Sequence, residues 1–267
     1  MNTKTLTLLT IVVAMALGCK KTKKNEDEKI DARTTMDSTS ATITLEKLEG
    51  SPAYEDALLD MTQPSSTKMK SAGEVNFAFT VNNYELGSQT DSTMANMLAN
   101  SDKGQHIHFI LNNQPYSAHY EPEFKKEIPE GTHHLVAFLS RSYHESVKNE
   151  NSVVVKKLMV GNNPQDTLNL DMEAPTLIYS RPKGEYTGKD TENLMLDFFV
   201  LNTTLSEDGN KVRATINGTE FMITEWAPQV IKGLPKGEVT IKLELLDGEG
   251  NLIPGVFNEV TRTVMLK

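Results

Sequence analysis

The stretch GQHIHFILNN, residues 104–113, decides the fold, because the chain repeats it in altered form as GNKVRATING, residues 209–218. In both stretches apolar side chains recur at every second position, which is the period of a half-buried β-strand. Further apolar stretches on both sides recur at similar spacing, and they pair 75–81 with 194–200, 128–139 with 234–245, and 154–160 with 260–266. The sequence therefore predicts two copies of one β-rich unit.

Each copy consists of short predicted strands that are separated by Gly, Pro, Asn and Asp. About seven strands at spacings of about ten residues are typical of an immunoglobulin-like β-sandwich. We therefore predict an all-β chain with two tandem immunoglobulin-like β-sandwich domains, over residues 41–172 and 174–267. A short polar segment that contains Pro164 and Pro175 joins the two domains.

The N-terminus predicts export from the cytoplasm. Lys4 precedes an apolar stretch from Leu6 to Leu17, and small residues then lead to Cys19, the single cysteine of the chain. This arrangement resembles a bacterial lipobox, in which a signal peptide is removed and the cysteine is acylated. We predict a lipoprotein signal peptide over residues 1–18 and a flexible tether over 19–40, with lipidation at Cys19 (palmitate). Such an anchor would hold the protein at the cell envelope, in the outer membrane of a two-membrane bacterium.

The composition narrows the possible functions. A formal net charge of −9 argues against binding to nucleic acid. The sequence contains no Gly-x-Ser-x-Gly elbow, no phosphate-binding loop and no His-Glu-x-x-His motif. We therefore expect a non-enzymatic binding or scaffolding module, which presents a surface to an envelope protein or a glycan.

The histidines suggest an alternative function. All six lie in the first copy: His106, His108, His119, His133, His134 and His144. Strand alternation places His106 and His108 on the outer face of one strand, and it places His134 on the outer face of a neighbouring strand. Three imidazoles on one solvent face could bind Zn²⁺ or copper, although the sequence requires no cofactor. The second copy has Lys211 and Arg213 at the positions of the first pair, and this favours an ordinary polar face instead.

The segment after the strand near residue 139 is rich in charged side chains. Arg141, His144 and Lys148 could bind an anionic or sugar ligand. The same side chains could instead hold a long loop together through hydrogen bonds. A hydrolase with a spatially assembled site around His144 is a third hypothesis.

Several linked motifs carry a resemblance to a known family. They are GQHIH at 104–108, GTHHLVAFLSRSYHESVK at 131–148, YSRPKGEY at 179–186, GLPKG at 233–237, LLDGEGN at 245–251 and PGVFN at 254–258. Together they are similar to a family of exported two-domain bacterial lipoproteins with no assigned activity, seen in cyanobacteria and Bacteroidetes-type organisms. The resemblance covers residues 57–267. It implies a lipoprotein with two domains, and it implies no site residues.

Overall fold

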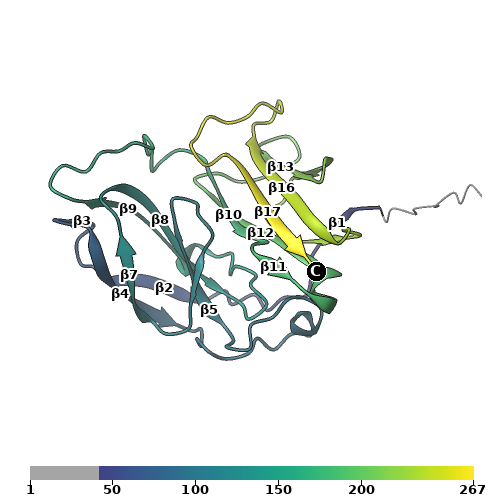
Figure 1. Ribbon diagram of the computed structural model, residues 1–267, viewed down its shortest axis with the longest axis horizontal. Helices are drawn as coiled ribbons and strands as arrows, with labels where there is room; N and C mark the ends of the chain where they lie inside the picture. Colours follow the sequence, from purple (N-terminus) through teal and green to yellow (C-terminus); the bar gives the residue numbers. More distant parts are fainter. Residues whose placement is uncertain (1–41) are drawn as a thin grey trace, which may run out of the picture. The chain divides into compact units, whose positions relative to one another are not determined.

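The computed structural model describes residues 42–267, and Figure 1 shows its strands in sequence colours. The predicted signal peptide, the predicted tether and Cys19 lie outside the described residues. Within 42–267 the structure consists of strands and three short 3-10 helices, η1 (Thr93–Asn96), η2 (Glu150–Ser152) and η3 (Gly188–Thr191). None of the helices in this part of the chain has the length and apolar character needed to cross a membrane.

The first sandwich consists of two sheets. The smaller sheet has the order β2-β4-β7, formed by Leu58–Gln63, Gly73–Asn82 and Glu123–Ile128. The larger sheet has the order β3-β9-β8-β5-β6, formed by Lys68–Met69, Val153–Val160, Gly131–Ser140, His106–Leu111 and Ser117–His119. Buried apolar side chains from both sheets fill the space between them, among them Phe77, Ile107 and Leu135.

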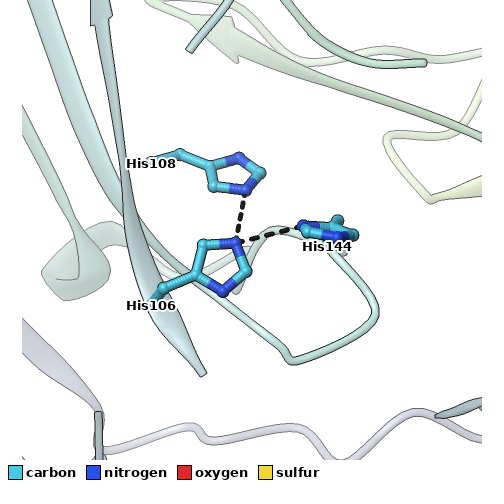
Figure 2. Close-up of side chains that lie close together, drawn as sticks. All are labelled: His106, His108 and His144. Atoms are coloured by element: carbon cyan, nitrogen blue, oxygen red, sulfur yellow. Dashed lines mark hydrogen bonds between the residues drawn. The ribbon is translucent and has the colours of Figure 1, made fainter. Parts of the chain in front are cut away.

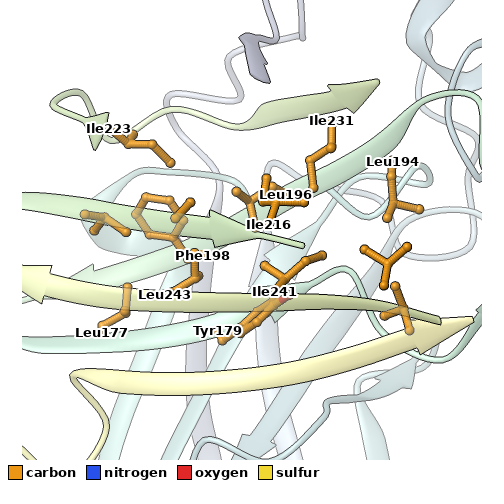
Figure 3. Packing of buried hydrophobic residues seen from close by; sticks show 14 of the residues in the cluster. Leu177, Tyr179, Leu194, Leu196, Phe198, Ile216, Ile223, Ile231, Ile241 and Leu243 are labelled. Carbon is orange, nitrogen blue, oxygen red and sulfur yellow. The ribbon is translucent and has the colours of Figure 1, made fainter. Parts of the chain in front are cut away.

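The second sandwich repeats this arrangement. Its larger sheet has the order β11-β17-β16-β13-β14, formed by Glu185–Tyr186, Glu259–Leu266, Gly237–Leu246, Lys211–Ile216 and Thr219–Ile223. Its smaller sheet contains β10 (Thr176–Arg181), β12 (Leu194–Leu201) and β15 (Gln229–Lys232). Figure 3 shows the core between the two sheets, where Phe198, Ile216 and Leu243 are buried. The predicted all-β fold with two immunoglobulin-like sandwiches is confirmed.

The two copies also agree in detail. In each, the first two-residue strand pairs in parallel with the last strand, as β3 with β9 and β11 with β17. In each, the hairpin between the last two long strands closes with the same backbone hydrogen bonds, from Arg141 N to Glu145 O and from Asp247 N to Asn251 O. These equivalent residues are 106 positions apart in the sequence. The structure thus contains the duplication that the sequence pattern predicted.

The structure corrects the boundary predicted at residue 41. Strand β1 (Thr44–Lys47) does not join the first sandwich, because it pairs antiparallel with β15 and extends the smaller sheet of the second sandwich. Ile43 and Leu45 pack against the second core. Pairing with the edge of β15 satisfies backbone groups that the edge of a sheet otherwise leaves open. The second sandwich therefore contains a strand that precedes the first sandwich in the sequence.

The larger sheet of the first sandwich and the smaller sheet of the second bury their outer faces against one another. Ile110, Val136 and Phe138, on the outer face of the larger first sheet, pack with Ile178 and Phe199 of the second sandwich. The rings of Phe138 and Phe199 stack with centroids 4.9 Å apart. This packing covers the face of β5 and β8 that the sequence analysis assigned to solvent. It determines the surroundings of the histidines.

Candidate metal centre

The side chains of His106 and His108 are fully buried on β5. The expectation that they face solvent is wrong, although the alternation that placed them on the outer face of the sheet is right. That outer face is covered by the second sandwich, so the two imidazoles lie at the junction between the sandwiches. Ser180 on β10 contacts His108 from the second sandwich, with 3.1 Å between Ser180 Oγ and His108 Nδ1.

Three imidazoles converge at this junction, as Figure 2 shows. The Nε2 atoms of His106 and His108 lie 2.9 Å apart, and His144 Nδ1 lies 3.1 Å from His106 Nε2. One nitrogen from each ring lies within 4.8 Å of the other two. Two ligands come from one strand and the third comes from the loop that follows β8. This arrangement has the donor set and spacing of a zinc or copper site.

In His106 and His108, the Nδ1 atom contacts a group outside the cluster, and this contact orients the ring so that Nε2 points toward the other histidines. His106 Nδ1 lies 2.8 Å from the carbonyl oxygen of Gly104. A carbonyl only accepts hydrogen bonds, so Nδ1 carries the proton and Nε2 presents a lone pair to the cluster. His108 Nδ1 contacts the Ser180 hydroxyl on its outer side. Hydrogen bonds of this kind orient metal-binding histidines and set their tautomer.

Burial keeps the three rings in the form that binds metals. It lowers the pKa of His106 from 6.5 to about 4. Burial also holds the pKa of His108 and of His144 well below 6.5, and the positive charges of Arg181 and Lys183 act in the same direction. All three imidazoles are therefore neutral at pH 7. Metal binding at neutral pH needs no proton to leave them.

His144 occupies a strained backbone position. Its φ is +71°, in the left-handed region that few residues other than glycine adopt. The equivalent residue in the second copy is Gly250, with φ +88° and the same hydrogen bond from its N–H to the carbonyl three residues before. Histidine is one of the few non-glycine residue types that are enriched in this region, and the turn directs His144 Nδ1 toward His106 Nε2.

The structure removes His134 from the predicted metal site. Strand β8 runs antiparallel to β5, and Ser140 and Phe138 are the residues opposite His106 and His108. His134 therefore lies four residues from the position opposite His108 and six from the position opposite His106, roughly 13 and 20 Å along the strand. Its ring is buried near Phe257 of the second sandwich, at a centroid distance of 5.5 Å. Sequence alternation predicts the correct face of the sheet for His134, but only the register shows that it lies at the opposite end of β8 from the residues that pair with His106 and His108.

Arg141 and Lys148, which were predicted to bind a ligand, have protein partners instead. Arg141 is 4% exposed, and its guanidinium pairs with Glu145 at 2.9 Å and donates to Ser146 O. Lys148 pairs with the fully buried Asp197 of β12. The loop thus forms its own ion pair and a second one across the junction. Of the three loop residues, His144 alone presents its functional atoms to a candidate site.

His144 does not form the triad that a serine-type hydrolase requires. In residues 42–267 its Nδ1 contacts Tyr116 OH at 3.2 Å and His106 Nε2 at 3.1 Å, and no serine–histidine–carboxylate chain of hydrogen bonds passes through it. One feature of the sequence sets His144 apart from the other histidines. It aligns with Gly250, in a turn that requires a positive φ.

A groove on the first sandwich lies beside the histidine cluster. It has a volume of about 920 Å³, and its lining includes the aromatic rings of Tyr84, Tyr120 and Phe124 and the carboxylate of Glu85. The ring of Tyr120 also lies 5.0 Å from that of His106. The groove provides an exposed surface that combines aromatic rings with charged groups, which is a common composition for ligand sites.

Neither a protein-family model nor a curated protein sequence matches the chain. Similar solved structures include the fibronectin(III)-like modules of Clostridium thermocellum CbhA, at 13% identity and a TM-score of 0.28 over 79% of this chain and 94% of that one. SGBP-B of the Bacteroides ovatus mixed-linkage glucan utilization locus, in complex with a heptasaccharide, has 12% identity and a TM-score of 0.23 over 84% and 47%. The central fibronectin-III array of RIM-binding protein has 10% identity and a TM-score of 0.24 over 83% and 71%.

Proposed function

We propose that the chain is a metal-binding envelope module, in which His106, His108 and His144 hold one Zn²⁺ or copper ion at the junction of its two sandwiches. The observation that carries the proposal is the convergence of three neutral imidazole nitrogens within 4.8 Å. Histidine nitrogens at 2.0–2.1 Å from a tetrahedral zinc ion lie about 3.3 Å from one another. The two closest pairs in the cluster, at 2.9 and 3.1 Å, are near this spacing.

Hydrogen bonding alone satisfies this cluster poorly. His106 Nε2 carries no proton, because Nδ1 of the same ring donates to Gly104 O. Both His108 Nε2 and His144 Nδ1 face this single lone pair. The Tyr116 hydroxyl can donate to His144 Nδ1, but the lone pairs of His144 Nδ1 and His106 Nε2 then face each other at 3.1 Å in a buried site, which is unfavourable. A divalent cation accepts all three lone pairs at once.

The enclosure of the centre supports a holding role rather than turnover. His108 is fully buried, and the second sandwich covers it through Ser180. A metal in this place would stabilise the junction that orients the two sandwiches. The proposal therefore keeps the module non-enzymatic, with the metal supporting a binding or scaffolding surface. The partner would be an envelope protein or a glycan.

Calorimetric titration tests the metal proposal. The full chain with Cys19→Ala, which removes the competing thiol, is stripped with a chelator and titrated with Zn²⁺ and with Cu²⁺. We expect binding of one ion per chain, and we expect the double variant His106→Ala/His108→Ala to lose it. A matched control is His134→Ala, which removes a buried histidine of the same face and should bind normally. Equal heats from the double variant and the unchanged chain would refute the proposal.

We further propose that a lipid on Cys19 holds the module at the envelope. The support is the apolar segment and small residues that precede this single cysteine. Metabolic labelling with a radioactive fatty acid should mark the chain in bacterial cells, and Cys19→Ser should remove the label. A labelled Cys19→Ser chain would contradict the assignment of the lipid to this residue.

A further inference from the structure

Tyr116 lies against the histidine cluster without belonging to the predicted ligand set. It directly precedes β6 and is 4% exposed. Its ring stacks on that of His108, with centroids 3.5 Å apart and 12° between the planes. Its hydroxyl lies 3.2 Å from His144 Nδ1. The phenol oxygen is thus within hydrogen-bond distance of one of the three converging nitrogens.

The spacing of Tyr116 continues the series found among the histidines. The distances from His108 to His106, from His106 to His144 and from His144 to Tyr116 are 2.9, 3.1 and 3.2 Å between the facing atoms. Adjacent donors around a tetrahedral zinc ion are about 3.3 Å apart. Three histidines leave one position of such an ion open, and the phenol oxygen lies 3.2 Å from one of their converging nitrogens.

Two positive charges surround the same phenol ring. Lys183 Nζ lies 3.9 Å from the ring centroid and donates to the carbonyl oxygen of Tyr116 at 2.8 Å. The guanidinium carbon of Arg181 lies 5.6 Å from the centroid. Arg181 is 7% exposed; its Nη1 donates to the Tyr186 hydroxyl at 2.6 Å, whereas its Nε has no hydrogen-bond partner.

The carboxylate whose charge acts on Arg181 is that of Asp197, its partner in the β10–β12 register, and Asp197 already pairs with Lys148. Within residues 42–267, neither Arg181 nor Lys183 forms an ion pair with a carboxylate. A buried cation is costly unless an opposite charge or hydrogen bonds compensate it. A divalent metal ion on neutral imidazoles would add further positive charge. An anionic ligand at this place would balance both.

We propose that Tyr116 is the fourth ligand of the centre and binds the metal through its phenolate oxygen. The inference rests on the proposed three-histidine site. When the metal binds, the O–H bond of Tyr116 breaks, the oxygen forms a bond to the metal, and the proton leaves to the solvent. Because His108 and Tyr116 stack in parallel, one ion reaches both donors only when the rings tilt apart. Burial raises the pKa of the metal-free Tyr116 phenol, and the positive charge of Arg181 opposes this, so the phenolate forms only with the bound metal ion.

Copper provides a direct readout, because a phenolate bound to Cu²⁺ absorbs visible light by charge transfer, whereas imidazole and water ligands do not give this band. The full chain with Cys19→Ala is titrated with CuSO₄ at pH 7 and followed by visible absorption. Calorimetry in two buffers of different ionisation enthalpy counts the protons released. We expect the charge-transfer band and one released proton per copper ion.

Two tyrosine variants separate the ligand from its neighbours. Tyr116→Phe should lose the band and the released proton, and its copper affinity should fall by roughly 100-fold, at least as much as loss of a group that supports a metal ligand. Tyr120→Phe is the matched control, because its ring also contacts His106 but its hydroxyl bonds to Ser101. This control should keep both signals.

The outcomes distinguish the two proposals. Copper binding without a charge-transfer band in the unchanged chain would overturn the role of Tyr116 and leave the three histidines as the site. A band that persists in Tyr116→Phe would also overturn it. Absence of any copper binding would refute the histidine site itself, and the Tyr116 proposal with it.

Discussion

Strands β5 and β13 occupy the same place in the two sandwiches, yet they carry different side chains. The first reads HIHFIL and is buried on both faces up to its last residue, whereas the second reads KVRATI and alternates between buried and half-buried positions. In the second copy, Arg213 takes the position of His108 and forms a two-point ion pair with Glu244 at 2.9 and 3.0 Å. In the first copy, the residue opposite His108 is Phe138.

The difference shows how a second packed face changes what one strand can carry. The outer face of β13 is open enough for long charged side chains, which keep part of their surface in water. The outer face of β5 is covered by the second sandwich, so its polar side chains must find partners inside the protein. Imidazoles satisfy this condition because they can remain neutral. A partly exposed ion pair in the second copy thus corresponds to a cluster of neutral, buried imidazoles in the first.

The largest expected effect comes from the pair of equivalent residues Phe138 and Glu244. Phe138→Ala leaves a cavity at the junction, because this fully buried ring packs on Phe199. We expect a loss of about 3–5 kcal/mol in the free energy of unfolding. Glu244→Ala removes a buried carboxylate whose basic partners Arg213 and Lys242 keep about a third of their side chains in water, and it should cost about 1–2 kcal/mol. Urea unfolding of both variants measures the difference, and equal losses would contradict the assignment of a buried and an open face.

Acid should destabilise the first copy more than the second, and His134 provides a specific test. Its equivalent in the second copy is the exposed Thr240. Burial lowers the pKa of His134 from 6.5 to about 4, so between these values the unfolded chain binds a proton that the folded chain does not. The free energy of unfolding therefore falls as the pH falls from 6.5 to 4. His134 alone contributes a loss of roughly 3 kcal/mol.

The variant His134→Thr isolates this contribution from those of the other buried histidines, which act in the same direction. Urea unfolding of the metal-free protein at several pH values should show a shallower dependence between pH 6.5 and 4 in the variant. The comparison uses the pH dependence of the free energy of unfolding and not its value at one pH, because loss of the buried ring changes stability at every pH. Parallel curves for the two proteins would show that His134 is not held neutral by burial.

The smallest expected effect concerns the turn that contains His144 in the first copy and Gly250 at the equivalent position in the second copy. His144→Gly relieves the positive φ and should raise the free energy of unfolding of the metal-free protein by about 1 kcal/mol. The same variant should lose the metal site. Gly250→His has open space around its new side chain and should cost about 1 kcal/mol through its φ of +88°. A metal-free His144→Gly protein that is clearly less stable would indicate a structural role for the imidazole.

The fold could be predicted because both the period-two alternation of the strands and the internal duplication are visible in the amino-acid sequence. It missed the junction, although the sequence contained a signal: Ile110, Val136 and Phe138 interrupt the alternation and make both strands apolar on each face. Continuous apolar strands indicate burial on both sides. The pairing of β1 with the second sandwich could not be predicted in this way. Strand β1 has only four residues and one apolar side chain, which is too little to indicate the strand with which it pairs.

Period-two alternation also predicted part of the candidate site. His106 and His108 lie two residues apart on one strand, so alternation alone brings them together. His134 was included because the register between β5 and β8 cannot be read from alternation, which repeats every second residue along the whole strand. His144 lies in a loop, where no periodicity applies. Only its alignment with a glycine in the second copy indicates that its position is unusual.

Anomalous X-ray diffraction at the zinc edge, from crystals grown with Zn²⁺, tests the central claim most directly. The account predicts a peak at the junction of the two sandwiches, about 2.0–2.1 Å from His106 Nε2, His108 Nε2 and His144 Nδ1. Zinc bound elsewhere in the crystal, with no peak among these three nitrogens, would contradict it.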